Sequence, residues 1–393
     1  MKIRRSGFVL FGLLFFGCSS TGGEPGDVAI GLDRNASDTH QQTEEDQVQP
    51  PVDVDLSDLP VDQAGSFNVG YRTLSITYMP PVLTETRTIE LHIWYPTLAE
   101  SGEAAVYQKV FEDPESFLDA PLAAPKSAEG YPLHIHSHGD KGFGATSAFM
   151  MRRFASHGWV AVAPDHTLNT IADSIEPKPM SIFFLRGTDI IATLDALNFL
   201  GGEDPLKGIL GTDNVLLSGH SFGAHTCWSV AGATFDMSLI PEECSGIGSS
   251  PSGECTIKEL GTFEGGLRDS RVSAILIMDG IIRSSMFGTE GHKSVEIPVL
   301  FMNGKRDIEE SKEHFESAEG MDFSWVEIKE ACHQSFALGF CETLDTDLGY
   351  EIVNTYALAF ARKHILGVND TLVEMILNGE HIVSEKATFK KHP

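Results

Sequence analysis

Basic residues are scarce in this sequence. Its 393 residues include 28 Lys and Arg against 56 Asp and Glu, which gives a formal net charge of -28 at pH 7. A negative field of that size repels phosphate backbones and argues against nucleic acid as a partner. The chain is 41% hydrophobic and 21% charged, which is typical of a folded protein rather than a disordered or fibrous one. The length suits one large α/β domain with additions, or two small domains.

The N-terminus also lacks an apolar run long enough to span a membrane. Residues 7–17 form an uncharged run of eleven residues, whereas a helix that spans a membrane needs about 20. The run follows Lys2, Arg4 and Arg5 and ends before Cys18. A basic start, a short apolar centre and a small residue before the cleavage point are typical of a secretory signal.

The end of this apolar run resembles a bacterial lipobox, in which the cysteine is lipidated and becomes the mature N-terminus. We therefore predict a lipoprotein signal peptide at residues 1–18 that ends at the lipidated Cys18. The alternative is an ordinary signal peptide with an incidental cysteine. Ser19 is compatible with export to the outer membrane or cell surface, where the lipid would anchor the protein; without the lipid, the protein would be periplasmic or secreted.

The segment that follows contains no aromatic residue. Between residues 19 and 63 the sequence has eleven acidic residues and one basic residue, Arg34. Such a segment cannot bury enough apolar surface to offset the entropy lost on ordering. We predict an acidic disordered tether at residues 19–66, with a binding tail as the alternative, and a folded domain at residues 67–393.

Cysteine is sparse, with six residues in the whole chain. Five remain besides the lipidated one, so at least one has no partner within the chain. Export to an oxidising compartment would allow disulfides to form. The pairs that we expect are Cys332 with Cys341 and Cys244 with Cys255, which leaves Cys227 as a free thiol. The alternative is that Cys332 is unpaired and packs under its loop.

Hydrophobic periodicity from residue 67 onward predicts an α/β domain. Residues 73–78 and 88–94 alternate in polarity and predict antiparallel strands. Strands alternating with helices indicate a doubly wound, mostly parallel sheet that follows these N-terminal antiparallel strands. A Gly- and Ser-rich insert occupies residues 234–270. The short apolar runs that predict buried parallel strands are 133–137, 159–163, 214–218, 272–278 and 298–302; the helical patterns are 145–156, 183–200 and 350–365.

A G-x-S-x-G motif at residues 219–223 follows one of these apolar runs and precedes a helical pattern at 224–231. In this strand–turn–helix context the motif indicates a nucleophile elbow, with glycines on both sides because larger side chains would clash. The strained turn would hold Ser221 at a helix N-terminus, where developing negative charge is favoured. The backbone N–H of Phe222 would then point at an oxyanion.

The strand at 133–137 continues into His138 and Gly139, the place where such a sheet carries a second oxyanion donor. We expect the backbone N–H of Asp140 to be that donor, with its carboxylate turned outward. The alternative is a zinc site, because His134, His136 and His138 share one face of a strand. Period-two neighbours on a buried strand rarely converge on one ion, so we predict no metal and no cofactor.

His333 lies in the loop between the strand-like residues 323–328 and the last long helix, and it is the candidate general base. The order Ser, Asp, His along the chain fits a hydrolase triad. Asp279 ends the apolar run at 272–278, and Asp307 follows the next run. Either carboxylate could orient the imidazole and stabilise the imidazolium.

These motifs together resemble the platelet-activating factor acetylhydrolase group within the dienelactone hydrolase-like α/β hydrolases. That group places its acid in an Asp-Gly or Asp-Ala piece, which implies Asp279, whereas bacterial relatives closer to dienelactone hydrolases use the later position, which implies Asp307. The matching pieces are IWYP at 93–96, SHG at 137–139, ASHG at 155–158, GHSFG at 219–223, MDG at 278–280 and HQSFA at 333–337.

The resemblance implies an α/β-hydrolase fold and a serine carboxylic ester hydrolase, similar to 1-alkyl-2-acetylglycerophosphocholine esterases. Ser221 would attack an ester carbonyl and His333 would accept its proton. The implied substrates are short-acyl esters such as acetyl phospholipids. One alternative is a polyester or cutinase-like hydrolase. The other is a non-catalytic surface binding protein on a hydrolase scaffold.

Overall fold

A computed structural model of the chain describes residues 59–125, 130–246, 255–304, 308–368 and 370–392. The predicted signal peptide, Cys18 and most of the predicted tether lie outside these residues. Val61 is buried and the Gly65 amide donates to Ser156 Oγ at 3.0 Å. The chain therefore packs against the domain several residues before residue 67. Among the described helices, none has both the length and the apolar character to cross a bilayer.

One eleven-stranded sheet organises the domain, with the order β11-β10-β9-β8-β7-β5-β6-β2-β1-β4-β3. The six strands from β10 to β6 pair in parallel, and β1, β2 and β6 pair antiparallel. This is the predicted doubly wound sheet behind antiparallel strands. The strands are β1 (Asn68–Tyr78), β2 (Arg87–Thr97), β3 (Ala104–Tyr107), β4 (Phe111–Leu118), β5 (Tyr131–Ser137), β6 (Val160–Pro164), β7 (Leu210–His220), β8 (Val272–Met278), β9 (Val299–Asn303), β10 (Phe323–Ile328) and β11 (Ala387–Lys391).

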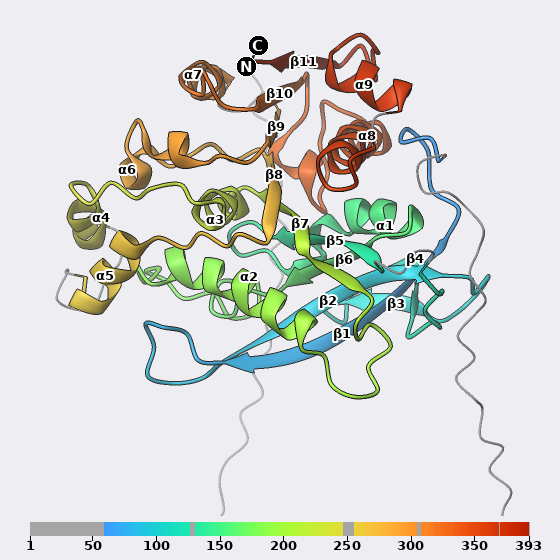
Figure 1. Cartoon of the computed structure of the whole chain (residues 1–393), viewed down its shortest axis with the longest axis horizontal. Coiled ribbons are helices and arrows are strands. Elements are labelled where there is room, and N and C mark those ends of the chain that lie inside the picture. The colour runs from blue at the N-terminus through green and yellow to red at the C-terminus, as the bar shows by residue number, and fades with distance from the viewer. Residues whose placement is uncertain (1–58, 126–129, 247–254, 305–307, 369, 393) are drawn as a thin grey trace, which may run out of the picture. The chain divides into compact units, whose positions relative to one another are not determined.

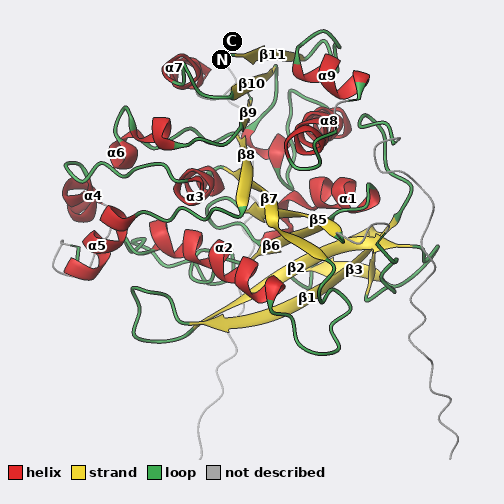
Figure 2. Ribbon diagram, in the orientation of Figure 1, coloured by secondary structure: helices red, strands yellow, loops and turns green. Residues whose placement is uncertain are grey.

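Helices cover both faces of the sheet, as Figures 1 and 2 show. One face carries α2 to α7, and the other carries α1, α8 and α9. Because both faces are covered, the central strands are apolar on both sides, and every residue of β6 and β9 is buried. The helices are α1 (Ala148–Ser156), α2 (Ile182–Asn198), α3 (Phe222–Ala231), α4 (Ile240–Gly246), α5 (Ile257–Gly265), α6 (Ser284–Phe287), α7 (Ile308–Ser317), α8 (Thr346–His364) and α9 (Thr371–Leu377), with short 3-10 turns η2 (Gly144–Ser147), η3 (Gly291–Ser294) and η4 (His333–Phe336).

The insert predicted at residues 234–270 contains α4 and α5 in its described part. The disulfide Cys244–Cys255 connects the C-terminal part of α4 to the residue just before the cap of α5. Thr256 and Glu259 form a capping box at the start of α5, which satisfies two amides that the first turn would leave unpaired. The described part of the insert is therefore a folded helical element of the domain.

The parallel strands bring the ends of several segments to one edge of the sheet. The carboxyl ends of β5, β7 and β8 lie at neighbouring positions because Ser137 pairs with Gly219 and His220 pairs with Met278. In open α/β sheets this edge is where ligands bind. Each of the three strands is followed directly by a residue or loop that the sequence singled out.

Candidate active site

The turn between β7 and α3 has the strained geometry of a nucleophile elbow. Ser221 has φ 55° and ψ -115°, a conformation that residues with a side chain rarely adopt. A Cβ at Gly219 would overlap the Gly223 carbonyl, and a Cβ at Gly223 would overlap the Ser137 carbonyl. Both glycines of the motif are therefore required by close backbone packing, as the sequence predicted.

The serine is tied to the neighbouring strand and to a helix terminus. Its backbone N–H donates to the Met278 carbonyl at 2.9 Å, which fixes the turn against β8. Phe222 is the first residue of α3, a helix of ten residues. The unpaired amides and the dipole at this N-terminus favour negative charge beside Ser221.

The loop after β5 lies against the elbow. A Cβ at Gly139 would be 3.2 Å from Ser221 Cβ, so the loop that carries the Asp140 amide passes directly beside Ser221. The Asp140 carboxylate accepts a hydrogen bond from Asn169 at 2.7 Å and pairs with Lys178 at 2.9 Å. Partial burial raises the pKa of Asp140, but these two partners outweigh it and lower the pKa. The carboxylate is engaged by the loop after β6.

The three histidines of β5 and its end are bound to protein groups. His134 Nε2 and His136 Nδ1 both hydrogen-bond to Ser218 Oγ, at 2.7 and 2.8 Å. His138 Nδ1 bonds to the Gly139 carbonyl, and its Nε2 accepts the His166 amide. Burial lowers the pKa of His134 to about 3, so its ring is neutral. Each histidine has a structural partner.

Within the described ranges, the ligand atoms of Glu90, His92 and Asp165 lie close enough together to share an ion. This grouping differs from the three histidines of β5 and its end. His92 Nδ1 bonds to Tyr71 Oη at 2.6 Å, and His92 Nε2 bonds to Asp165 at 3.2 Å. Both imidazole nitrogens are therefore already used in hydrogen bonds. His92 and Asp165 therefore belong to a polar network with Tyr71 that joins β1, β2 and the residue after β6.

The structure brings His333 and Asp279 together. His333 Nδ1 is hydrogen-bonded to Asp279 Oδ2, and the Gly304 amide donates to Asp279 Oδ1 at 3.0 Å. Burial raises the pKa of Asp279, but the hydrogen bonds from His333 and Gly304 lower it below its usual value. An ionised Asp279 holds the proton of His333 on Nδ1, which leaves Nε2 as the basic nitrogen. Asp307, the other candidate acid, lies outside the described residues.

His220 is a site residue that sequence reasoning missed. It occupies the first of the two variable positions of the G-x-S-x-G motif, so the motif itself does not single it out. Its Nε2–H donates to the backbone carbonyl of His333 at 3.0 Å, and the two rings lie 4.5 Å apart. Burial lowers the pKa of His220 to about 3, so it stays neutral. His220 therefore connects the nucleophile turn to the loop of the candidate base.

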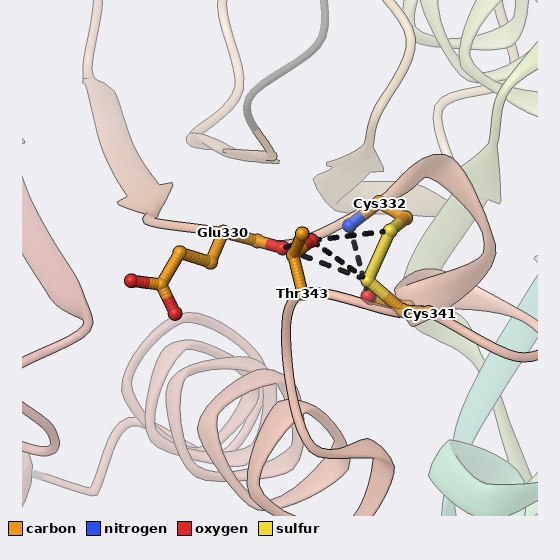
Figure 3. The surroundings of a disulfide bond; sticks show 5 residues. Glu330, Cys332, Cys341 and Thr343 are labelled. Atoms are coloured by element: carbon orange, nitrogen blue, oxygen red, sulfur yellow. Dashed lines mark hydrogen bonds between the residues drawn. A yellow bond between two sulfur atoms is a disulfide. The ribbon is translucent and has the colours of Figure 1, made fainter. Parts of the chain in front are cut away.

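A disulfide joins Cys332 to Cys341 directly beside His333, and Figure 3 shows this bridge next to Glu330 and Thr343. The Cα atoms are 5.5 Å apart, against 5.4 Å for Cys244–Cys255. Both pairs are the expected ones. The remaining thiol, Cys227, is buried in α3, and burial raises its pKa. Such a thiol is unreactive.

Removal of the bridge at the base should affect both stability and rate. Replacing Cys332 and Cys341 by Ser should lower the free energy of unfolding by about 2–3 kcal/mol, because the closed loop is short. We also expect kcat of any reaction in which His333 is the base to fall several-fold, since the loop of His333 loses its covalent closure. Thermal unfolding and steady-state kinetics measure the two effects.

The second bridge provides a matched control, because its separation of 11 residues is close to the 9 of the first. Cys244→Ser with Cys255→Ser should destabilise the protein to a similar extent without the same loss of kcat. An equal loss of kcat in both double variants would mean that the effect is general destabilisation.

Comparison with known proteins supports the fold. The sequence matches no protein-family model and no curated protein sequence. The structure is similar to that of a ferulic acid esterase from Streptomyces cinnamoneus, with a TM-score of 0.56 and 18% sequence identity. The similarity covers 88% of this chain and 100% of that one. The domain therefore has the α/β-hydrolase fold.

Proposed function

We propose that this protein is a serine esterase that hydrolyses carboxylic esters. The observation that carries the proposal is the pair of Asp279 and His333 at the sheet edge that also bears the strained elbow of Ser221. His333 lies beside His220, the residue before the nucleophile. An oriented base near a serine on a nucleophile elbow is the arrangement that acyl transfer requires.

The chemistry follows from the roles of these groups. Ser221 Oγ attacks the ester carbonyl carbon while His333 Nε2 takes the hydroxyl proton. The amides of Phe222 and Asp140 hold the oxyanion of the tetrahedral intermediate. Collapse of the intermediate breaks the bond to the alcohol, which leaves with the proton from His333. Water, activated by the same imidazole, then releases the acid and restores Ser221. No cofactor enters these steps.

The proposed substrates are short-acyl esters, including acetyl phospholipids, and this choice rests on the resemblance of the motifs to acetylhydrolases. A polyester or cutinase-like activity is the alternative within the same chemistry. The structural neighbour is named for an aromatic acid ester, so a ferulate ester belongs in the same substrate series. All of these share the acyl-enzyme step.

Covalent labelling tests the proposal before any substrate is known. The purified protein should react with a fluorophosphonate at Ser221, as identified by peptide mapping. A series of p-nitrophenyl esters from acetate to palmitate then measures acyl preference, and we expect the highest kcat/KM at the short end. A folded protein that neither labels nor turns over any ester would instead be a binding protein on a hydrolase scaffold.

We also propose that the protein is a lipoprotein held at a membrane through Cys18. Cys18→Ala should prevent lipidation, so that the variant either remains unprocessed or appears in the soluble fraction. Membrane fractionation and mass spectrometry of the N-terminus measure this. A wild type that is wholly soluble, with an N-terminus other than Cys18, would contradict the lipid anchor. The two disulfides agree with an oxidising, exported location.

A further inference from the structure

A fully buried arginine lies behind the candidate oxyanion hole. Arg186 is on α2 and has no exposed surface. Its guanidinium uses all three nitrogens as donors, and each acceptor is a neutral oxygen. The acceptors are Thr226 Oγ1 at 3.2 Å, Asn169 Oδ1 at 2.5 Å, Ser137 Oγ at 3.1 Å and the His138 carbonyl.

These contacts reach the loop that carries one proposed oxyanion donor. Arg186 holds the Ser137 side chain and the His138 carbonyl, the two residues just before Gly139. It also holds Asn169, whose amide donates to the carboxylate of Asp140. The loop is therefore fixed on both sides of Gly139 by one guanidinium, directly or through one side chain.

The same guanidinium contacts the element that carries the other donor. Its central carbon lies 4.6 Å from the centre of the Phe222 ring, and its Nε donates to Thr226 one turn further along α3. A cation over an aromatic face is attracted by the ring quadrupole. Arg186 thus connects the two backbone segments whose amides would share the oxyanion.

A buried series of hydrogen bonds from Ser137 through His166 to Asp189 also supports this arrangement. Ser137 Oγ bonds to His166 Nε2 at 2.9 Å, and His166 Nδ1 bonds to Asp189 Oδ2 at 2.9 Å. The order of atoms is that of a Ser-His-Asp triad, but all three side chains are buried, so no substrate reaches this serine. The chain fixes the orientation of Ser137, which in turn accepts from Arg186.

We propose that Arg186 is a positioning residue that holds the Phe222 and Asp140 amides in the geometry of an oxyanion hole. This inference rests on the proposed esterase function. A multidentate, planar donor is suited to the task because it fixes several acceptors at once. Its positive charge, hydrogen-bonded directly only to neutral oxygens, would also favour the developing negative charge of the transition state.

The charge is retained despite burial. Burial lowers the pKa of Arg186 to about 9, while Asp189 and Asp140 act in the opposite direction. The side chain therefore remains protonated at neutral pH. A buried cation costs solvation free energy, and here its hydrogen bonds are directed at the segments that flank the nucleophile.

Two substitutions at Arg186 separate its charge from its geometry. Arg186→Met keeps a long side chain but removes charge and donors, and it should lower kcat about 10²-fold while KM changes little, as for loss of an oxyanion donor. Arg186→Lys keeps the charge without the planar guanidinium, and its kcat should lie between those of the wild type and Arg186→Met. The matched control is Arg362→Met, because Arg362 is equally buried in α8 and bonds to His157.

The decisive readout is the affinity for a trifluoromethyl ketone, which binds serine hydrolases as an anionic adduct of the nucleophile. Its affinity should fall in parallel with kcat/KM in the Arg186 variants and stay at the wild-type level in Arg362→Met. A loss that tracks only the unfolding temperature, equal in Arg186→Met and Arg362→Met, would overturn the inference.

If Arg186→Met does not fold, Arg186→Lys and Asn169→Ala decide the question. Asn169→Ala removes the link between Arg186 and Asp140 and should lower kcat about 10-fold, since it loosens one of the two donors. Raised KM with unchanged kcat in both would contradict the positioning role. An inactive, unlabelled wild type would instead contradict the esterase proposal itself, so the two failures are distinguishable.

Discussion

Replacing Ser221 with Ala should lower esterase turnover about 10⁶-fold, because the group that forms the acyl-enzyme is lost. The fold should survive the change. Ala has the same Cβ as Ser, so the backbone strain at φ 55° is unchanged. The hydrogen bond from the backbone N–H of residue 221 to the Met278 carbonyl does not involve the side chain. Steady-state kinetics, fluorophosphonate labelling and circular dichroism of the purified variant measure rate, nucleophile and fold.

A serine on the helix that follows Ser221 provides the control. Ser229 is buried in α3 and donates to the His225 carbonyl at 2.8 Å. Ser229→Ala should still react with the fluorophosphonate and should retain nearly all of the wild-type rate. A well-folded Ser221→Ala protein with more than a few per cent of the wild-type rate would show that another residue is the nucleophile.

The nucleophile turn was predictable because its requirement is local. Two glycines are needed where backbone segments touch, and that need is visible as a spaced motif between a strand pattern and a helix pattern. The central strands were predictable for a related reason. A strand covered on both faces is a continuous apolar run, and β8 and β9 are such runs.

Strands at or next to the ends of the sheet were not predicted, because they break those patterns. β4 lies beside the edge strand β3 and contains Pro114 among several acidic residues, where the pairing of the two strands shifts register. Proline in a strand is confined to edges or bulges. β11 is half-exposed and carries two lysines, which is typical of an edge that resists further pairing. Both read as loops when only polarity is considered.

The contacts of Arg186 and His220 could not be predicted, because they depend on side chains that meet across distant parts of the sequence. Arg186 follows four apolar residues at the start of α2, and its acceptors lie on β5, on the loop after β6 and on α3. No sequence spacing encodes such a meeting. Helical periodicity shows which face is buried, but it does not show what a buried polar residue contacts.

The identity of the acid is ambiguous in the sequence for a geometric reason. Adjacent parallel strands end at the same edge, so Asp279 after β8 and Asp307 after β9 are both candidates to approach one histidine. The hydrogen bond between Asp279 and His333 joins residues 54 positions apart. That contact, with the support of the Gly304 amide, favours Asp279 as the orienting acid.

Asp279→Asn should therefore lower kcat about 10⁴-fold while the protein remains folded. A carboxamide at this position no longer selects the tautomer with the proton on Nδ1, and it cannot stabilise the imidazolium that forms in the transition state. Burial raises the pKa of Asp279, but the hydrogen bonds from His333 and Gly304 lower it below its usual value, so the wild-type carboxylate stays ionised at neutral and mildly acidic pH. Mild acidification should not reproduce the variant by protonating Asp279. Kinetics with p-nitrophenyl acetate and the unfolding temperature measure the two properties.

Asp307→Asn is the comparison that makes this result specific. It makes the same chemical change after the neighbouring strand, and if Asp279 orients His333 it should cost only a few-fold in kcat. The opposite ranking of the two variants would assign the role to Asp307. Mild and equal losses would place the acid elsewhere. A large loss confined to Asp279→Asn, with wild-type stability, would support the orienting role, because the substitution keeps the size of the side chain while it removes the negative charge and replaces one acceptor oxygen with an amide donor.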